Sequence, residues 1–212
     1  MRTRHEGIEL GLGLVSLGRQ WGVGNVEPPD DANAATLLQR AVELDIRVFD
    51  TAPAYGSSEE RLGRFLTSLS PAQRQNRTVM TKAGEHWDAQ HGSRVDHSRD
   101  GLCRSIDRSL HLLGRIDVLQ IHKATRDVVA SEGVHAAIGY AHTAGIAQIG
   151  ASVSDLEAAR LALQTGLYDV LQFPLNADST TFLPLLPAIE AQSAMPVINR
   201  PFAMGGLVAG AG

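Results

Sequence analysis

The sequence predicts an α/β protein that folds as a parallel (β/α)8 barrel of the TIM type, with seven of the strands recognisable in the chain. Short apolar segments alternate with helical patterns along the whole length, and the connections between them are short, so the sheet must be parallel. Seven strands of this kind favour a barrel over an open doubly wound sheet. Three successive strands also end in Asp50, Lys82 and His122, and in such a barrel that end carries the chemistry.

The predicted strands are short runs of aliphatic and β-branched residues bounded by turn-forming residues. They cover residues 10–18, 47–50, 78–82, 117–122, 146–152, 169–173 and 195–199. The first contains Gly11, Gly13 and Ser16, which half-match the GxGxxG loop that binds dinucleotide phosphates. No strand precedes this segment and no helix begins on it, so the phosphate-loop interpretation fails in context. Small residues packed where the barrel closes are the better explanation.

Helices are predicted between the strands, most of them beginning at a capping residue. The expected caps are Asp30 or Asp31, Ser57 or Ser58, Ser98 or Asp100, and Ser154 with Asp155. Two further helices are expected over residues 128–143 and 180–192. The helical spacing of apolar residues predicts the inward sides, which for the first helix carry Leu37, Leu38, Ala41 and Leu44.

Two loops are expected to build the substrate pocket, over residues 18–29 and 84–97. The first contains Trp21, which either lines that pocket or anchors the loop. The second is predicted as a long polar loop with His86, His91 and His97. Their spacing fits no usual zinc pattern and no cysteine lies nearby in the sequence, so solvated histidines are expected rather than a metal site.

The composition predicts one ordinary globular domain over residues 1–212. Lys and Arg number 19 against 23 Asp and Glu, a net charge of −4, which offers no electrostatic footprint for nucleic acid or an anionic membrane. The single cysteine, Cys103, excludes an intrachain disulfide and suits a reducing compartment. No apolar run reaches the length of a signal peptide core or a membrane span, so the expected location is the cytoplasm.

Tyr55 follows Asp50 by five positions, in a loop with proline and glycine that can bend the tyrosine back over the carboxylate. Together with Lys82 and His122, these two residues resemble the Asp-Tyr-Lys-His tetrad of the aldo-keto reductases. The flanking sequence is similar to that family in the helix start after the tyrosine and in the approach to the histidine, at residues 55–63 and 105–122. The resemblance runs from about residue 7 to the last residue.

The resemblance implies reduction of a small-molecule aldehyde or ketone with hydride from NADPH, and it does not exclude NADH. No side chain donates hydride, so a reduced nicotinamide must supply it. Tyr55 would donate the proton, because a phenol with a pKa of about 10 becomes a usable acid once the Lys82 ammonium lowers that pKa. Asp50 would hold this ammonium in place, and His122 would hydrogen-bond and orient the carbonyl oxygen.

The same resemblance assigns cofactor contacts. Ser152 and Gln172 match residues that bond the nicotinamide carboxamide after the fifth and sixth strands, and Asp50 belongs to the same site. Where the family often has asparagine this chain has Val153, so one carboxamide contact is in doubt. Many members place an aromatic side chain on the nicotinamide after the seventh strand. Here either that stacking is lost or Arg200 provides a flat substitute.

The family continues beyond the position of Leu207 with a helix, an eighth strand and the helix start that binds the adenosine phosphate, whereas this sequence stops at Gly212. We therefore expect an unpaired edge on the first and the last strand. Either further residues of the natural protein close this gap, or a second copy covers it as a homo-oligomer. Two other functions stay open: cofactor-independent acid–base chemistry on a carbonyl compound, such as enolisation or dehydration, and a cofactor-sensing regulatory subunit resembling the β-subunits of potassium channels.

Overall fold

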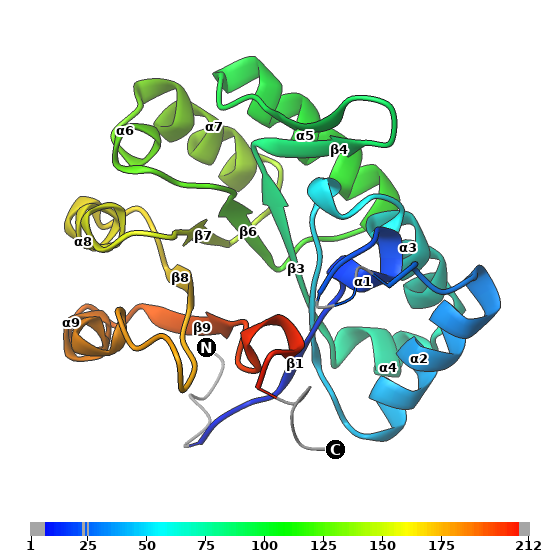
Figure 1. Cartoon of the computed structure of the whole chain (residues 1–212). Coiled ribbons are helices and arrows are strands. Elements are labelled where there is room, and N and C mark those ends of the chain that lie inside the picture. Colours follow the sequence, from blue (N-terminus) through cyan, green and yellow to red (C-terminus); the bar gives the residue numbers. More distant parts are fainter. Residues whose placement is uncertain (1–6, 23, 25, 208–212) are drawn as a thin grey trace.

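The computed structural model describes residues 7–22, 24 and 26–207. Seven parallel strands form one sheet in the order β1-β2-β3-β6-β7-β8-β9, which runs round the centre of the molecule with helices on its outside (Figure 1). The strands are β1 Gly11–Gly13, β2 Val48–Asp50, β3 Thr78–Ala83, β6 Val118–Ile121, β7 Gln148–Ser152, β8 Val170–Pro174 and β9 Met195–Asn199. The predicted fold class is therefore confirmed, as a nearly closed barrel.

The outer layer consists of the helices that connect these strands, and its apolar sides pack on the sheet in one continuous core. Phe49, Leu119 and Phe173 are fully buried strand residues within it. The helices are α1 Val15–Gly18, α2 Asp31–Glu43, α3 Ser58–Ser68, α4 Pro71–Gln75, α5 Arg99–Leu113, α6 Arg126–Val129, α7 Glu132–Thr143, α8 Leu156–Thr165 and α9 Leu186–Ala191, with short 3-10 turns η1 Pro53–Tyr55, η2 Leu183–Leu185 and η3 Ala203–Gly205. No helix in the described part of the chain is long and apolar enough to cross a membrane.

The first predicted strand is too long. Only residues 11–13 are extended, and residues 15–18 turn into α1. The ladder to β2 ends where the Leu14 amide donates to the Asp50 carbonyl at 2.9 Å, and the turn that follows buries Leu14 and Leu17. Gly18 then lies directly against the backbone of Tyr55, where a Cβ atom would overlap the Tyr55 carbonyl oxygen. This contact ties the end of β1 to the loop that carries Tyr55.

Residues 84–97 form an antiparallel hairpin rather than an irregular loop, with β4 at Glu85–Asp88 and β5 at Gly92–Val95. The turn is stabilised by the Asp88 carboxylate, which accepts hydrogen bonds from the backbone amides of Gln90 and His91 at 2.8 and 2.9 Å. Gly92 follows with φ at +73°, a conformation that glycine adopts readily. The sequence prediction missed the hairpin because its strands are polar and largely exposed.

Several helix predictions need correction in detail. The helix predicted over residues 128–143 is interrupted at Ser131, and the one over 180–192 is regular only in α9. On α2, Leu38 and Ala41 are buried as predicted, but Leu37 and Leu44 are 44% and 61% exposed, so the inward stripe is narrower than expected. The Asp30 cap of α2 is confirmed by the bond from the Asn33 amide to its carboxylate, at 2.8 Å.

The two outer strands of the sheet each have a free edge among the described residues, as predicted: β1 pairs only with β2, and β9 only with β8. Apolar side chains lie exposed on or beside these edges. Leu10, Met195 and Ile198 are 69%, 40% and 39% exposed.

Gly63→Ala is expected to lower the free energy of unfolding by about 1–3 kcal/mol, because a methyl group there would overlap the Leu112 carbonyl oxygen where α3 packs on α5. Gly139→Ala on α7 is the matched control, since its Cβ would meet open space and alanine is the better helix former. Urea denaturation of both variants measures the difference. Equal stability of the two would show that α3 and α5 can separate at no cost.

Candidate active site

An ion pair lies at the carboxyl ends of β2 and β3. The Lys82 Nζ is 2.8 Å from both carboxylate oxygens of Asp50 and donates to the Thr51 carbonyl at 3.1 Å. The Lys82 side chain is only 1% exposed, so its charge needs these acceptors. Burial lowers the pKa of Lys82, but Asp50 and Tyr55 outweigh it and hold the pKa above its ordinary value. The lysine is therefore charged at neutral pH.

Two buried amides complete the surroundings of the Asp50 carboxylate. Gln120 Nε2 donates to Oδ1 at 3.1 Å, and Gln172 Nε2 donates to Oδ2 at 3.0 Å. Ser152 Oγ in turn donates to Gln172 Oε1 at 3.3 Å. The structure thus joins the predicted residues Asp50, Ser152 and Gln172 in one network. Gln120 was not predicted as a site residue, although a polar residue inside the otherwise apolar β6, two positions before His122, was an available signal.

Tyr55 ends the short turn η1 and lies between Lys82 and His122. Lys82 Nζ is 4.9 Å from the centre of the Tyr55 ring, and the His122 ring meets it edge-on with centres 6.1 Å apart. Burial raises the pKa of the Tyr55 phenol, and the Lys82 charge lowers it in part. The net direction is upward, opposite to the lowering expected from Lys82 in the sequence, because burial outweighs the Lys82 charge. Tyr55 is therefore a protonated phenol at neutral pH.

His122 directly follows β6, and its backbone is held on both sides. Its amide donates to the Ala83 carbonyl at 2.8 Å, and its carbonyl accepts from His97 Nε2 at 2.7 Å. Burial, helped by the Lys82 charge, lowers the pKa of the His122 imidazole to about 3. The ring is therefore neutral at neutral pH, and the position of its one proton decides which nitrogen donates and which accepts.

The Glu85 carboxylate lies beside this ring, with Oε2 3.1 Å from His122 Nδ1. Glu85 is 5% exposed and also receives Lys123 Nζ at 2.7 Å and the Ser93 hydroxyl. These partners hold the Glu85 pKa below its usual value despite burial. Nδ1 has no hydrogen-bond partner among the described residues, so its contact with Glu85 is electrostatic rather than a hydrogen bond. The Glu85 charge at this distance favours the tautomer with the proton on Nδ1, which leaves Nε2 as an acceptor. Glu85 was missed in the sequence because it falls in the segment predicted as a polar loop.

Glu85→Gln is expected to move the proton of neutral His122 from Nδ1 to Nε2, because the side-chain amide can donate to a bare Nδ1. Nitrogen NMR shifts of the His122 ring at neutral pH distinguish the two tautomers. Ser93→Ala is the control, since it removes another Glu85 partner and keeps the carboxylate. A His122 spectrum that is the same in wild type and Glu85→Gln would rule out control by Glu85.

A second layer of buried polar contacts joins α3 to the strands of the site. Thr81 Oγ1 donates to Glu59 Oε1 at 2.6 Å, and the Ser58 hydroxyl donates to the Leu14 carbonyl at 3.0 Å. Thr51 and Ser58 share a further hydrogen bond of 2.9 Å. Residues at the start of α3 thus hold the ends of β1, β2 and β3, which keeps Asp50 and Lys82 in register.

The remaining predicted cofactor residue, Arg200, is exposed in the turn after β9, where φ is +54° and its carbonyl accepts from Asn176 Nδ2 at 2.9 Å. The neighbouring Asn199 offers a different feature. Its Oδ1 is buried and has no hydrogen-bond partner among the described residues. Asn199 pairs in register with Pro174, two positions beyond Gln172, so this acceptor lies at the same end of the sheet.

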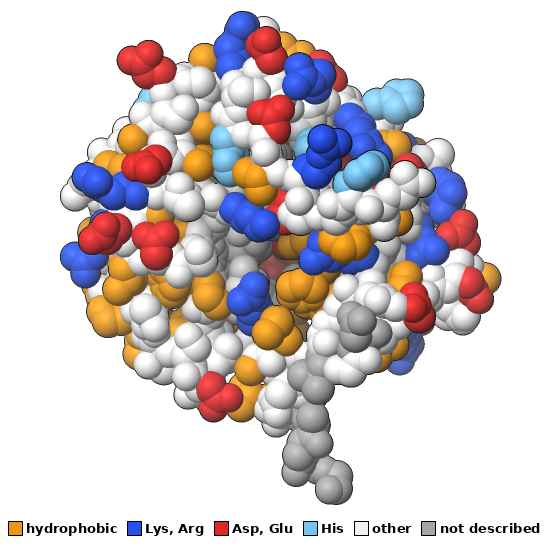
Figure 2. Space-filling model, turned by 45° about the horizontal axis from the view of Figure 1, so that its top comes forward, with side chains coloured by type: hydrophobic (Ala, Val, Ile, Leu, Met, Phe, Trp, Pro, Cys, Tyr) orange, Lys and Arg blue, Asp and Glu red, His pale blue; other side chains and the backbone are white. Residues whose placement is uncertain are grey.

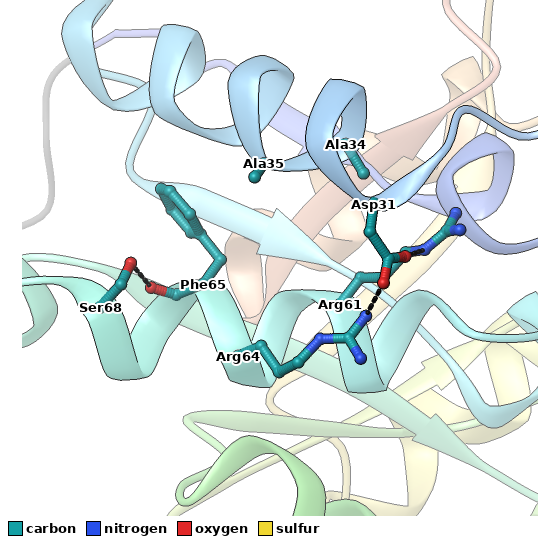
Figure 3. A pocket seen from close by; sticks show the side chains of 7 residues that line it. All are labelled: Asp31, Ala34, Ala35, Arg61, Arg64, Phe65 and Ser68. Atoms are coloured by element: carbon teal, nitrogen blue, oxygen red, sulfur yellow. Dashed lines mark hydrogen bonds and ion pairs between the residues drawn. The ribbon is translucent and has the colours of Figure 1, made fainter.

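Two other features lie outside this network. Within the described residues no group of three or more His, Cys, Asp or Glu side chains could hold a metal ion. A small hollow on the outer surface lies between α2 and α3, where Arg61 and Arg64 both bind the Asp31 carboxylate at 2.9 Å (Figure 3). Its charges are satisfied within the hollow itself, and none of the residues that line it belongs to the Asp50–Lys82 network.

The model of the aldo/keto reductase family matches residues 9–198, which is most of the chain. The protein belongs to the aldo/keto reductase family. It is 33% identical to L-glyceraldehyde 3-phosphate reductase of Escherichia coli (strain K12), over 58% of this chain and 36% of that protein. It is 30% identical to D-threo-aldose 1-dehydrogenase of a Pseudomonas species, over 98% of this chain and 71% of that protein.

The crystal structure of an aldo-keto reductase from Pseudomonas aeruginosa is also similar, with a TM-score of 0.77 and 31% identity over 89% of this chain and 71% of that one. The chain thus matches only about a third of the length of the glyceraldehyde phosphate reductase, but most of the length of the other two proteins.

Proposed function

We propose that this protein reduces an aldehyde or ketone to an alcohol with hydride from NADPH. The observation that carries the proposal is the buried Asp50–Lys82 ion pair, placed against a protonated Tyr55 and a neutral His122. Membership of the aldo/keto reductase family supports it. Two similar proteins are named as a reductase of L-glyceraldehyde 3-phosphate and a dehydrogenase of D-threo-aldose, which supports oxidoreductase chemistry at a carbonyl carbon.

In the proposed reaction the carbonyl carbon gains a hydride while its oxygen gains the Tyr55 proton. The phenolate that remains is stabilised by the Lys82 ammonium and regains a proton from solvent after the alcohol leaves. Asp50, Gln120 and Gln172 keep the ammonium in position during this charge change. Positioned proton transfer of this kind contributes about 10²–10⁴-fold to the rate.

His122 has an orienting role in this scheme. With its proton on Nδ1 beside Glu85, the Nε2 atom is an acceptor and cannot donate to the carbonyl oxygen. It accepts from a substrate hydroxyl instead, which leaves Tyr55 as the proton donor. This differs from the role that the family resemblance implies, and the reason is the Glu85 carboxylate, 3.1 Å from the ring.

The residues at the ends of β7, β8 and β9 fit a nicotinamide. Its carboxamide needs both a donor and an acceptor, and the Ser152 hydroxyl, the Gln172 amide and the unpartnered Asn199 Oδ1 supply both kinds of group. Gln172 uses one N–H on Asp50 and one lone pair on Ser152, so one of each remains. Arg200, in the exposed turn after β9, provides a flat cation for stacking. When bound, NADPH supplies the hydride.

Titration with NADPH and with NADH, followed by cofactor fluorescence, tests the proposal directly. We expect saturable binding of NADPH and loss of its absorbance when glyceraldehyde or an aromatic aldehyde is added. Absence of binding at high concentrations of both cofactors would contradict the reductase proposal. Exchange of substrate α-protons with deuterated water in that case would indicate the cofactor-independent acid–base enzyme, and cofactor binding without turnover of any carbonyl compound would indicate a sensing subunit.

A further inference from the structure

Arg19 lies beside the catalytic tyrosine without belonging to the tetrad. Its Nη1 donates to the carbonyl of Ala54, the residue before Tyr55, at 3.0 Å. The preceding Gly18 is packed against the Tyr55 backbone, and the Gly18 carbonyl accepts from the Ser57 amide at 3.4 Å. The guanidinium is thus anchored at the carboxyl end of the strands, beside the loop that carries Tyr55.

Two tryptophans hold this guanidinium. Arg19 Cζ lies 5.2 Å from the centre of the Trp21 ring and 4.6 Å from that of Trp87, within the range of cation–π contacts. Trp21 comes from the loop after α1 and Trp87 from the β4–β5 hairpin, the two segments expected to form the substrate pocket. Nη1 donates to the Ala54 carbonyl, and the planar fork of guanidinium N–H donors matches the two oxygens of a carboxylate or phosphate.

Among the described residues, the charges around the site pair with one another and leave Arg19 without a counter-ion. Lys82 is neutralised by Asp50 at 2.8 Å and Lys123 by Glu85 at 2.7 Å, whereas no carboxylate of a described residue lies within ion-pair distance of Arg19. Burial and the charges of Lys82, Lys123 and, last, Arg19 lower the pKa of His122, which agrees with the position of Arg19 beside the Tyr55 loop. Figure 2 shows Lys and Arg side chains around the mouth of a central hollow on this face.

We propose that Arg19 binds an anionic group of the substrate, so that the preferred substrates are aldehydes or ketones carrying a carboxylate or a phosphate. This substrate class rests on the proposed carbonyl reduction. Trp21 and Trp87 keep the guanidinium plane in position, and the excess positive charge favours anions over neutral compounds of the same shape. If Arg19 had a purely structural role and only joined the Trp21 loop to the hairpin, it would favour neither the anionic nor the neutral compounds.

The test compares 4-formylbenzoate with its neutral methyl ester. We expect wild-type kcat/KM to favour the anion, and Arg19→Gln to lower the ratio of the two values by about 10- to 100-fold, the size of a lost charge-assisted hydrogen bond. Arg19→Lys should restore part of the ratio. Arg40→Gln, on the outer helix α2, removes the same charge and should leave the ratio unchanged. Equal losses on both substrates in Arg19→Gln would overturn the proposal in favour of a structural role.

A second readout does not depend on turnover. Calorimetry should show benzoate binding to the wild-type protein at least about tenfold more tightly than to Arg19→Gln, and more weakly at high salt. If NADPH reduces no aldehyde, the reductase proposal fails, while this binding difference still decides the role of Arg19. Equal benzoate affinities would overturn the anion site. The kcat/KM values for glyceraldehyde 3-phosphate and for glyceraldehyde are then compared. They distinguish a preference for phosphate from a preference for carboxylate.

Discussion

Tyr55→Phe is expected to lower the turnover number for carbonyl reduction by about 10²–10⁴-fold, because the carbonyl oxygen loses its proton donor. The fold should persist, since phenylalanine keeps the ring that packs against Lys82 and His122. NADPH affinity should change little, because the proposed carboxamide contacts come from other strands. Steady-state kinetics, cofactor fluorescence and thermal unfolding measure the three quantities separately.

Tyr140→Phe is the matched control. Tyr140 lies on α7, where its hydroxyl donates to Asp107 at 2.6 Å, and this contact is exposed. The control variant should keep wild-type turnover. A Tyr55→Phe enzyme that retains more than a few per cent of wild-type turnover would exclude Tyr55 as the acid and point to another proton donor at the site.

Lys82→Met is expected to abolish reduction and also to destabilise the protein. Removing one partner of a buried ion pair typically costs about 3–5 kcal/mol, because the other charge stays buried. The cost here should lie at the low end, since Asp50 keeps its hydrogen bonds from Gln120 and Gln172. Activity is lost for a separate reason: the phenolate formed at Tyr55 no longer has a neighbouring cation.

The double variant Asp50→Asn/Lys82→Met separates these two effects. It removes the unpaired carboxylate, so denaturant unfolding should show part of the stability regained. Turnover should stay as low as in the single variant, because the cation is still missing. Recovery of turnover together with stability would contradict the proposed role of Lys82 and show that its effect is structural.

The family fold was predictable because its signals are local. Alternating strand and helix patterns with short connections require a parallel sheet, whatever the distant contacts are. Asp50, Lys82 and His122 stand at the ends of three strands in the sequence, and parallel pairing of β2, β3 and β6 brings such ends together. The sequence by itself thus determined the fold class and the meeting of Asp50, Lys82 and His122, but not that of Gln120 and Glu85 with them.

The tertiary structure alone decided how these residues are charged and what surrounds them. Glu85 lies beside His122 and Arg19 beside Ala54, pairs separated by 37 and 35 positions in the chain. No periodicity encodes such contacts, since they depend on how the β4–β5 hairpin and the loop after α1 fold over the strand ends. Burial of His122 and Tyr55, which sets the direction of their pKa shifts, likewise arises only when the layers pack. The proton positions that distinguish donor from acceptor are therefore a property of the packed site.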